Sequence, residues 1–208
     1  MILFIAILLA YMLGSIPTAV WAGKLFAGID VREHGSGNAG ATNALRVLGP
    51  GIAVPVLLLD IAKGLLATRL VFLNVFELNS FVLSNMDEAR LILGIAAVIG
   101  HIFPLFAQFK GGKGIATFFG ILIGFHFQSA MLSLGLFVVI VTITRYVSLG
   151  SILGALFYPI QLLLIFQLHS LFIQVFSILI PLMVIYTHRK NIARLLKGEE
   201  SKIRFVKS

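Results

Sequence analysis

Long apolar runs, separated by short polar segments, dominate the chain. They cover residues 2–25, 51–73, 89–108, 115–143, 147–167 and 170–187. A helix needs roughly 20 apolar residues to cross a bilayer core of about 30 Å, and each of these runs is close to or beyond that length. The pattern therefore predicts an all-α, polytopic membrane protein.

The run 115–143 can be interpreted in two ways. As one long span it gives six crossings; as a hairpin turning near His126–Ser129 it gives seven. Lysine and arginine collect in cytoplasmic loops, and seven of them lie in the tail between Arg189 and Lys207. Six crossings would separate this tail from the other basic loops. We therefore expect seven transmembrane helices, with the N-terminus outside and the C-terminus cytoplasmic. The helix at 115–127 is then short, and we expect it to be tilted or buried among its neighbours.

Composition agrees with a membrane protein and excludes several classes of site. Of the 208 residues, 59% are hydrophobic and 12% are charged, whereas a soluble domain has about 25% charged residues. The net charge of +8 reports orientation in the membrane, so we expect no nucleic-acid partner. Cysteine is absent, which excludes disulfides and thiolate sites. No internal repeat or linker is visible, and residues 1–208 are expected to form a single domain.

The first polar cluster, residues 34–46, is a glycine-rich loop that leads into a helix. Glycines permit positive φ, and successive backbone N–H groups can form an anion-binding nest. The candidate ligand contacts are Gly35, Ser36, Gly37, Asn38, Gly40, Thr42, Asn43 and Arg46. A glycine-rich turn that only caps a helix is the alternative, but so many donors beside a cation favour a phosphate site.

The second polar cluster, residues 100–114, ends where another helix begins. Glycine-rich backbone at a helix N-terminus binds anions through free N–H groups and the helix dipole. Its candidate residues are His101, Lys110, Gly111, Gly112, Lys113 and Gly114. It is not a P-loop, because Gly114 rather than Ser or Thr follows Lys113. The two lysines alone are also explained as markers of a cytoplasmic loop.

Three further groups complete the candidate chemistry. His188 and Asn191 are three residues apart and share a helix face at the end of the last span, with Glu199 further on. Arg145 lies at a predicted cytoplasmic turn, which topology alone would explain. Asp60 and Lys63 lie within the second span, as either a structural ion pair or a polar component of a site.

Several catalytic signatures are missing from the sequence. It contains no H-x-x-x-x-D, G-x-S-x-G or H-E-x-x-H motif and no carboxylate cluster suited to a divalent metal. The expected site is therefore metal-free, multiply cationic and located at the cytoplasmic face, and no cofactor is expected.

At these clusters the sequence resembles the PlsY family, the bacterial integral-membrane acyl-phosphate:glycerol-3-phosphate acyltransferases. The matching segments are Gly14–Thr18, Gly35–Asn43 with Arg46, Asp60–Gly64, Gly100–Pro104, Lys110–Gly114, and His188 with Asn191. The resemblance extends over essentially the whole chain. It implies acyl transfer from acyl-phosphate to the 1-hydroxyl of glycerol-3-phosphate, giving 1-acyl-glycerol-3-phosphate (lysophosphatidic acid) and phosphate, in the cell inner membrane and as the first acylation of phospholipid synthesis.

Roles follow from that resemblance as hypotheses. Ser36, with Thr42, Asn43 and nearby N–H groups, holds the acyl-phosphate or its developing oxyanion. Arg46 with Lys110 or Lys113 binds the glycerol-3-phosphate phosphate. His188 and Asn191 position the hydroxyl, and either His188 or the donor phosphate is the base. Besides the two substrates the expected partner is membrane lipid, and a monomer is compatible with the sequence. The alternative function is a transporter or channel for a phosphorylated solute.

Overall fold

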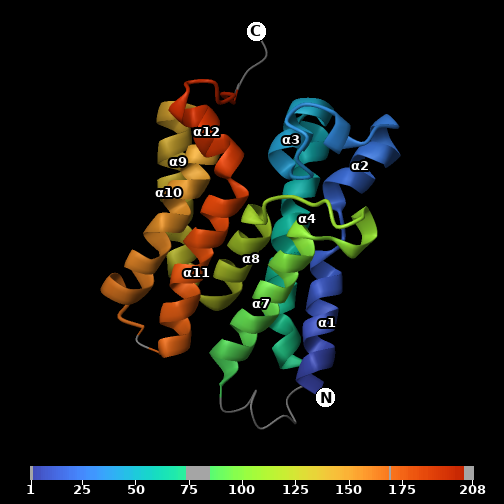
Figure 1. Ribbon diagram of the computed structural model, residues 1–208. Coiled ribbons are helices and arrows are strands. Elements are labelled where there is room, and N and C mark those ends of the chain that lie inside the picture. Colours follow the sequence, from blue (N-terminus) through green and yellow to red (C-terminus); the bar gives the residue numbers. More distant parts are fainter. Residues whose placement is uncertain (1, 74–84, 169, 204–208) are drawn as a thin grey trace. The chain divides into compact units, whose positions relative to one another are not determined.

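The computed structural model describes residues 2–73, 85–168 and 170–203, and every regular element within them is a helix (Figure 1). Within these described residues, five helical segments are long and apolar enough to cross a membrane, or six if the bent pair formed by α11 (Leu171–Thr187) and α12 (Arg189–Leu196) is one span. The prediction of an all-helical, polytopic protein is confirmed. The chain divides into two compact units, Met1–His126 and Phe127–Ser208, which are described in turn.

The helices of the first unit follow the predicted runs closely. They are α1 (Ile2–Gly14), α2 (Thr18–Ala27), α3 (Ala41–Leu48), α4 (Pro50–Arg69), α7 (Met86–Ile102) and α8 (Ile115–Phe125). The first run is broken at residues 15–17, because Pro17 has no N–H to continue the hydrogen bonds of α1. Residues 74–84, most of the connector before α7, and residues 204–208 of the basic tail lie outside the described residues.

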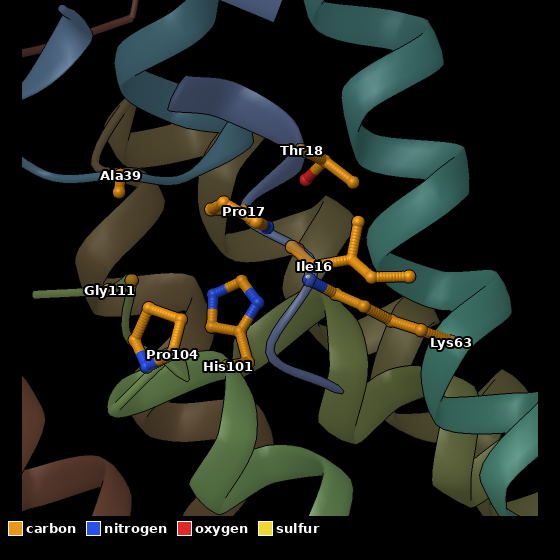
Figure 2. A pocket seen from close by; sticks show the side chains of 9 residues that line it. Ile16, Pro17, Thr18, Ala39, Lys63, His101, Pro104 and Gly111 are labelled. Carbon is orange, nitrogen blue, oxygen red and sulfur yellow. Dashed lines mark hydrogen bonds between the residues drawn. The ribbon is translucent and has the colours of Figure 1, made fainter. Parts of the chain in front are cut away.

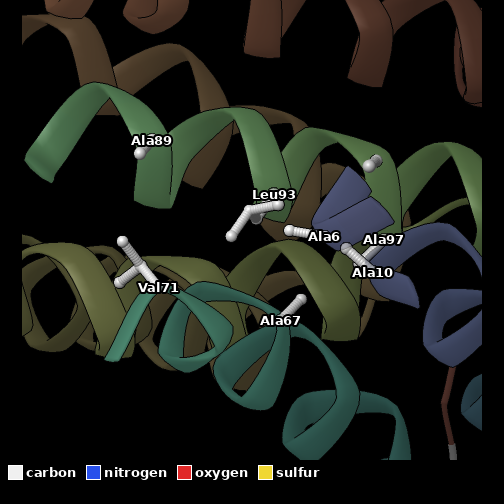
Figure 3. Packing of buried hydrophobic residues seen from close by; sticks show 8 residues of the cluster. Ala6, Ala10, Ala67, Val71, Ala89, Leu93 and Ala97 are labelled. Carbon is white, nitrogen blue, oxygen red and sulfur yellow. The ribbon is translucent and has the colours of Figure 1, made fainter. Parts of the chain in front are cut away.

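Helices α1 and α7 pack through small residues (Figure 3). A Cβ atom at Gly14 would collide with the carbonyl of Ala97, and one at Gly100 would collide with that of Tyr11. The two backbones therefore touch, as is common where membrane helices cross at small residues. Next to this crossing is a core of mostly alanine side chains: Ala6, Ala10, Ala67, Val71, Ala89, Leu93, Ala96 and Ala97.

A second pair of glycines joins α4 to α8. A Cβ at Gly64 would meet the carbonyl of Thr117, and one at Gly120 would meet that of Ile61. Six of the eleven residues of α8 are buried, and α8 also packs against α7. The expectation that this short helix is buried among its neighbours is confirmed.

The second unit begins immediately after a break at His126. Because α8 ends at Phe125 and α9 (Phe127–Thr144) follows, the run 115–143 forms two helices, as the hairpin interpretation requires. Helix α10 (Val147–Ile160) packs between α9 and α11 and continues into a π-helical turn at Gln161–Ile165. Helices α11 and α12 meet at an angle of 65°, and His188 is the residue at the bend.

Candidate functional site

Asn43, on α3, organises the first glycine-rich loop. Its side chain is 1% exposed. Its Oδ1 accepts hydrogen bonds from the Ser36 N–H at 2.8 Å and the Ser36 hydroxyl at 3.1 Å. Its Nδ2 donates to the carbonyls of Val31 at 2.8 Å and His34 at 3.0 Å. Asn43 therefore fixes the position of Ser36 from beneath the loop.

The loop presents Ser36 at the surface. Gly35 and Gly37, on either side, have φ values of 61° and 70°, in the left-handed region that favours glycine. Ser36 is exposed, and so is Arg46 on α3. The Ser36 and Gly37 N–H groups already bind Asn43 and the His34 carbonyl, so these two groups do not contribute to the expected nest. Asn38 and Thr42 are half-buried, while Gly40 is buried with a φ of −138°.

An Asp30–Arg32 pair connects this loop to the second one. The Arg32 guanidinium contacts both carboxylate oxygens of Asp30, at distances down to 2.6 Å. It also donates to the carbonyls of Ala107 at 2.9 Å and Lys110 at 3.4 Å. The hydrogen bond from Arg32 lowers the pKa of Asp30 to about 2, so the pair stays charged across the physiological range. No local sequence pattern marks this contact, because the carbonyl partners of Arg32 are 75 and 78 residues away along the chain.

The second loop folds back onto the end of α7. The Gly111 N–H donates to the Ile102 carbonyl and the Gly112 N–H to the His101 carbonyl, both at 3.1 Å. Lys110 is exposed and Lys113 half-buried. Gly114 has a φ of 82° and precedes α8, whose first N–H groups have no preceding turn to bind. The Gly111 and Gly112 N–H groups are therefore bound to the end of α7, which differs from the expectation that they bind an anion.

Asp60 and Lys63 form a buried ion pair at 2.8 Å, and their side chains are 1% and 4% exposed. Asp60 Oδ1 also accepts from the Thr18 hydroxyl at 2.5 Å and lies 3.7 Å from His101 Nδ1. Lys63 Nζ donates to the Ile16 carbonyl at 2.7 Å. The pair thus joins α4 to the break between α1 and α2.

A small cavity lies beside this pair (Figure 2). Its volume of about 10 Å³ has room for about one water molecule. Its lining comes from four segments of the first unit: Ile16, Pro17, Thr18, Ala39, Lys63, His101, Pro104, Gly111 and Gly112. The structure therefore brings the first loop, the second loop and Lys63 together.

The third cluster lies in the second unit. His188 is 2% exposed and Asn191 is 6% exposed. The His188 Nδ1 lies 2.9 Å from the Val184 carbonyl, which can only accept, so Nδ1 carries the proton. In the neutral ring the lone pair is then on Nε2.

The carboxylate that supports this cluster is Glu200. The sequence pattern points to Glu199, but the Glu199 side chain is exposed, whereas Glu200 is buried. Glu200 accepts from Asn191 Nδ2 at 2.6 Å, the Ser148 hydroxyl at 2.9 Å and Arg194 Nε at 2.7 Å. Burial raises the pKa of Glu200, but these three hydrogen bonds outweigh it, and the pKa is lowered.

The remaining candidate for a ligand contact is Arg145, at the turn between α9 and α10. Arg145 is exposed with a φ of 63°, and its carbonyl accepts from the Ile203 N–H at 2.8 Å. Within residues 2–73, 85–168 and 170–203, no group of three or more His, Asp or Glu side chains could hold a metal ion.

Together the apolar helices and the glycine-rich loops with their lysine and arginine residues define an integral membrane protein. The sequence model of the glycerol-3-phosphate acyltransferase family matches residues 4–198, and the chain belongs to this family. A glycerol-3-phosphate acyltransferase of Chlorobaculum tepidum is 44% identical over 99% of this chain and 98% of its own, and one of Chlorobaculum parvum is 42% identical with the same coverage.

Two solved structures share the fold. Both are crystal structures of PlsY (YgiH), an integral membrane glycerol 3-phosphate acyltransferase. The glycerol 3-phosphate form has a TM-score of 0.83 and 33% identity, covering 97% of this chain and 96% of that one. The lysophosphatidic acid form has a TM-score of 0.82 and 34% identity, with 97% and 95% coverage. The resemblance seen in the sequence is confirmed: the protein is an enzyme, a glycerol-3-phosphate acyltransferase, and the transporter alternative is set aside.

Proposed function

We propose that the acyl donor is acyl-phosphate and that the acceptor is the 1-hydroxyl of glycerol-3-phosphate. The hydroxyl oxygen forms an ester bond with the acyl carbon, the hydroxyl proton passes to a base, and the bond from the acyl carbon to the phosphate oxygen breaks. The products are 1-acyl-glycerol-3-phosphate and inorganic phosphate. The related PlsY structures are a glycerol 3-phosphate form and a lysophosphatidic acid form, which agrees with this acceptor and product.

The observation that carries the proposal is the exposed Ser36 hydroxyl, held at a glycine loop by buried Asn43. The Ser36 N–H also binds Asn43 Oδ1, so the Ser36 O–H can turn from Asn43 toward charge that develops on the acyl-phosphate and stabilise it. Arg46, and Lys110 or Lys113, provide the positive charge for the phosphate of the acceptor. Asn43 then acts through Ser36, because its own polar atoms are occupied inside the loop.

His188 is our candidate for the group that receives the hydroxyl proton. Its Nδ1 donates to the Val184 carbonyl, so Nε2 is the basic nitrogen of the neutral ring. Asn191, held by Glu200, is proposed to help position the hydroxyl. The alternative proton acceptor is a phosphate oxygen of the donor itself.

We further propose seven membrane crossings, with α8 as the short buried one, the N-terminus outside and the C-terminus cytoplasmic. This arrangement places the basic segments on the cytoplasmic side. The enzyme would then reside in the cell inner membrane as one domain, with its site open to cytoplasmic glycerol-3-phosphate and its acyl donor within the lipid.

The test uses purified protein in detergent with palmitoyl-phosphate and glycerol-3-phosphate. Phosphate and lysophosphatidic acid are followed together, and palmitoyl-CoA replaces the donor in a parallel reaction. We expect equal amounts of both products from palmitoyl-phosphate and none from palmitoyl-CoA. Ser36→Ala should abolish turnover, while Thr142→Val, which removes a hydroxyl from an exposed position of α9, should not. Product from palmitoyl-CoA at the same rate would refute the proposed donor.

A second variant decides the base. His188→Gln keeps the size and polarity of the side chain but cannot accept a proton at neutral pH. Loss of turnover with unchanged glycerol-3-phosphate binding would identify His188 as the base, whereas retained turnover would identify the donor phosphate. His126→Gln, at the break between α8 and α9, is the matched histidine control.

A further inference from the structure

His101 lies between a buried charge pair and the lysine–glycine loop of residues 110–114. On one side its Nδ1 is 3.7 Å from Asp60 Oδ1, and Asp60 is in turn bound to Lys63. On the other side its ring is so close to Gly112 that a Cβ there would collide with Nε2. Figure 2 shows the ring between the Ile16–Thr18 segment and the Pro104–Gly111 side of the cavity.

The backbone of the same residue also holds the loop. The His101 carbonyl accepts the Gly112 N–H, and the next carbonyl along α7 accepts the Gly111 N–H. A Cβ at Gly111 would collide with that His101 carbonyl, and one at Gly112 would lie 3.0 Å from the carbonyl of Ala39 in the first loop. His101 therefore contacts the second loop through both its ring and its carbonyl, at the point where that loop approaches Ala39 of the first.

The buried polar atoms around His101 are unusual for so apolar a protein. Asp60 Oδ2 and His101 Nδ1 have no hydrogen-bond partner among the described residues, and both are buried. Ionisable groups inside a membrane protein are costly, and they are usually paired or functional. The ion pair does not require a histidine for its own stability, because the Thr18 hydroxyl already binds Asp60 and the Ile16 carbonyl already binds Lys63.

We infer that His101 is a positioning residue for acceptor binding: its ring, which lies between the Asp60–Lys63 pair and Gly112, sets the loop 110–114 that receives the glycerol-3-phosphate phosphate. This inference rests on the proposed function, in which that loop supplies Lys110 or Lys113. His101 touches no reacting atom in this scheme. Its loss should therefore weaken acceptor binding and leave donor binding nearly unchanged.

The experiment measures KM for each substrate separately, at saturating concentration of the other. We expect His101→Ala to raise KM for glycerol-3-phosphate by about tenfold, equivalent to about 1.4 kcal/mol, while KM for palmitoyl-phosphate changes little. His101→Asn places an amide near the Nδ1 position and should restore part of the loss. Thr68→Val, which removes another buried hydrogen bond from α4, is the matched control and should leave both KM values unchanged.

A double-mutant cycle tests the contact with Gly112 directly. Because a Cβ at Gly112 would displace the ring, Gly112→Ala should raise the same KM. The double variant of Gly112→Ala and His101→Ala should raise KM no further than the larger of the two single effects. Asp60→Asn combined with Lys63→Met removes the anchor without leaving an unpaired charge, and should also raise KM for glycerol-3-phosphate.

The outcomes separate the inference from the proposed function. If the wild-type protein makes no lysophosphatidic acid, the proposed function fails. If it is active but the His101 variants change both KM values equally, or neither, the positioning role is refuted. Melting temperature in detergent is measured for every variant. His101→Asn supports the inference only if it changes KM for glycerol-3-phosphate while melting like the wild type. Equal melting with unchanged KM refutes it.

Discussion

Replacing Asn43 by Asp changes one NH₂ group to oxygen and leaves the size of the side chain almost constant. The substituted side chain can still accept from the Ser36 N–H and hydroxyl. It can no longer donate to the Val31 and His34 carbonyls, and it points a negatively charged oxygen at them instead. The substitution thus removes one buried and one partly buried hydrogen bond while preserving the two that hold Ser36.

The expected loss of stability follows from these contacts. A net contribution of about 0.5–1.5 kcal/mol for each hydrogen bond gives a loss of about 1–3 kcal/mol, before the repulsion between the carboxylate and the carbonyls is added. For a chain of this size, each kcal/mol corresponds to roughly 2–4 °C in melting temperature. A loss of about 2 kcal/mol therefore predicts a decrease of roughly 4–8 °C, together with reduced phosphate release.

Thermal unfolding of the detergent-purified protein between pH 5 and pH 8 provides the assay. Burial and the neighbouring carbonyls favour the protonated form of the introduced carboxyl, and that form regains one donor. The difference from the wild-type protein should therefore shrink as the pH falls. Asn38→Asp is the stability control, since it makes the same chemical change at a half-buried position of the same loop. A melting temperature equal to that of the wild type, or a difference that grows toward low pH, would refute the reasoning.

Two further predictions concern other parts of the chain. Glu200→Gln should destabilise the second unit and lower activity, whereas Glu199→Gln should do neither, as measured by melting temperature and phosphate release. Because the folded-state pKa of Glu200 lies below its ordinary value of 4.5, its contribution to stability is present above pH 4.5 and is lost as the pH falls through the folded-state pKa. The Gln variant should remove this part of the acid sensitivity, and an unchanged acid profile would contradict the assignment. Gly64→Ala should lower the melting temperature sharply, because its Cβ would meet the Thr117 carbonyl, while Gly51→Ala in the same helix meets nothing within 4 Å. Equal melting of the two glycine variants would show that α4 and α8 do not pack as described.

Sequence reasoning located the helices well because their signal is local. Apolar runs mark the spans, and Pro50 and Gly114 mark the starts of α4 and α8. The division of run 115–143 at His126 also followed from the distribution of basic residues along the chain. The apolar runs and the helix starts depend only on residues that are close together in the sequence, whereas the charge distribution is a property of the whole chain.

The partners of the polar residues could not be found in this way. Thr18 and Asp60 are 42 positions apart, and no periodicity relates them. Glu199 and Glu200 are equivalent in the sequence, and only the turn after α12 determines which one faces Asn191. The glycine pairs that bring α1 against α7 and α4 against α8 are likewise visible only when both helices of a pair are placed.

The Asp60–Lys63 pair shows how the fold and the site depend on each other. Inside a membrane an unsatisfied carbonyl and an unpaired charge are both costly. The break at residues 15–17 leaves the Ile16 carbonyl outside the regular hydrogen bonds of α1, and Lys63 donates to it. Asp60 neutralises Lys63 and accepts the hydroxyl of Thr18, the first residue of α2. The break thus gives the ion pair its partners, and the ion pair stabilises the break. Because α2 leads directly to Asp30 and the first glycine loop, a charge pair within the span contributes to the geometry of the candidate site.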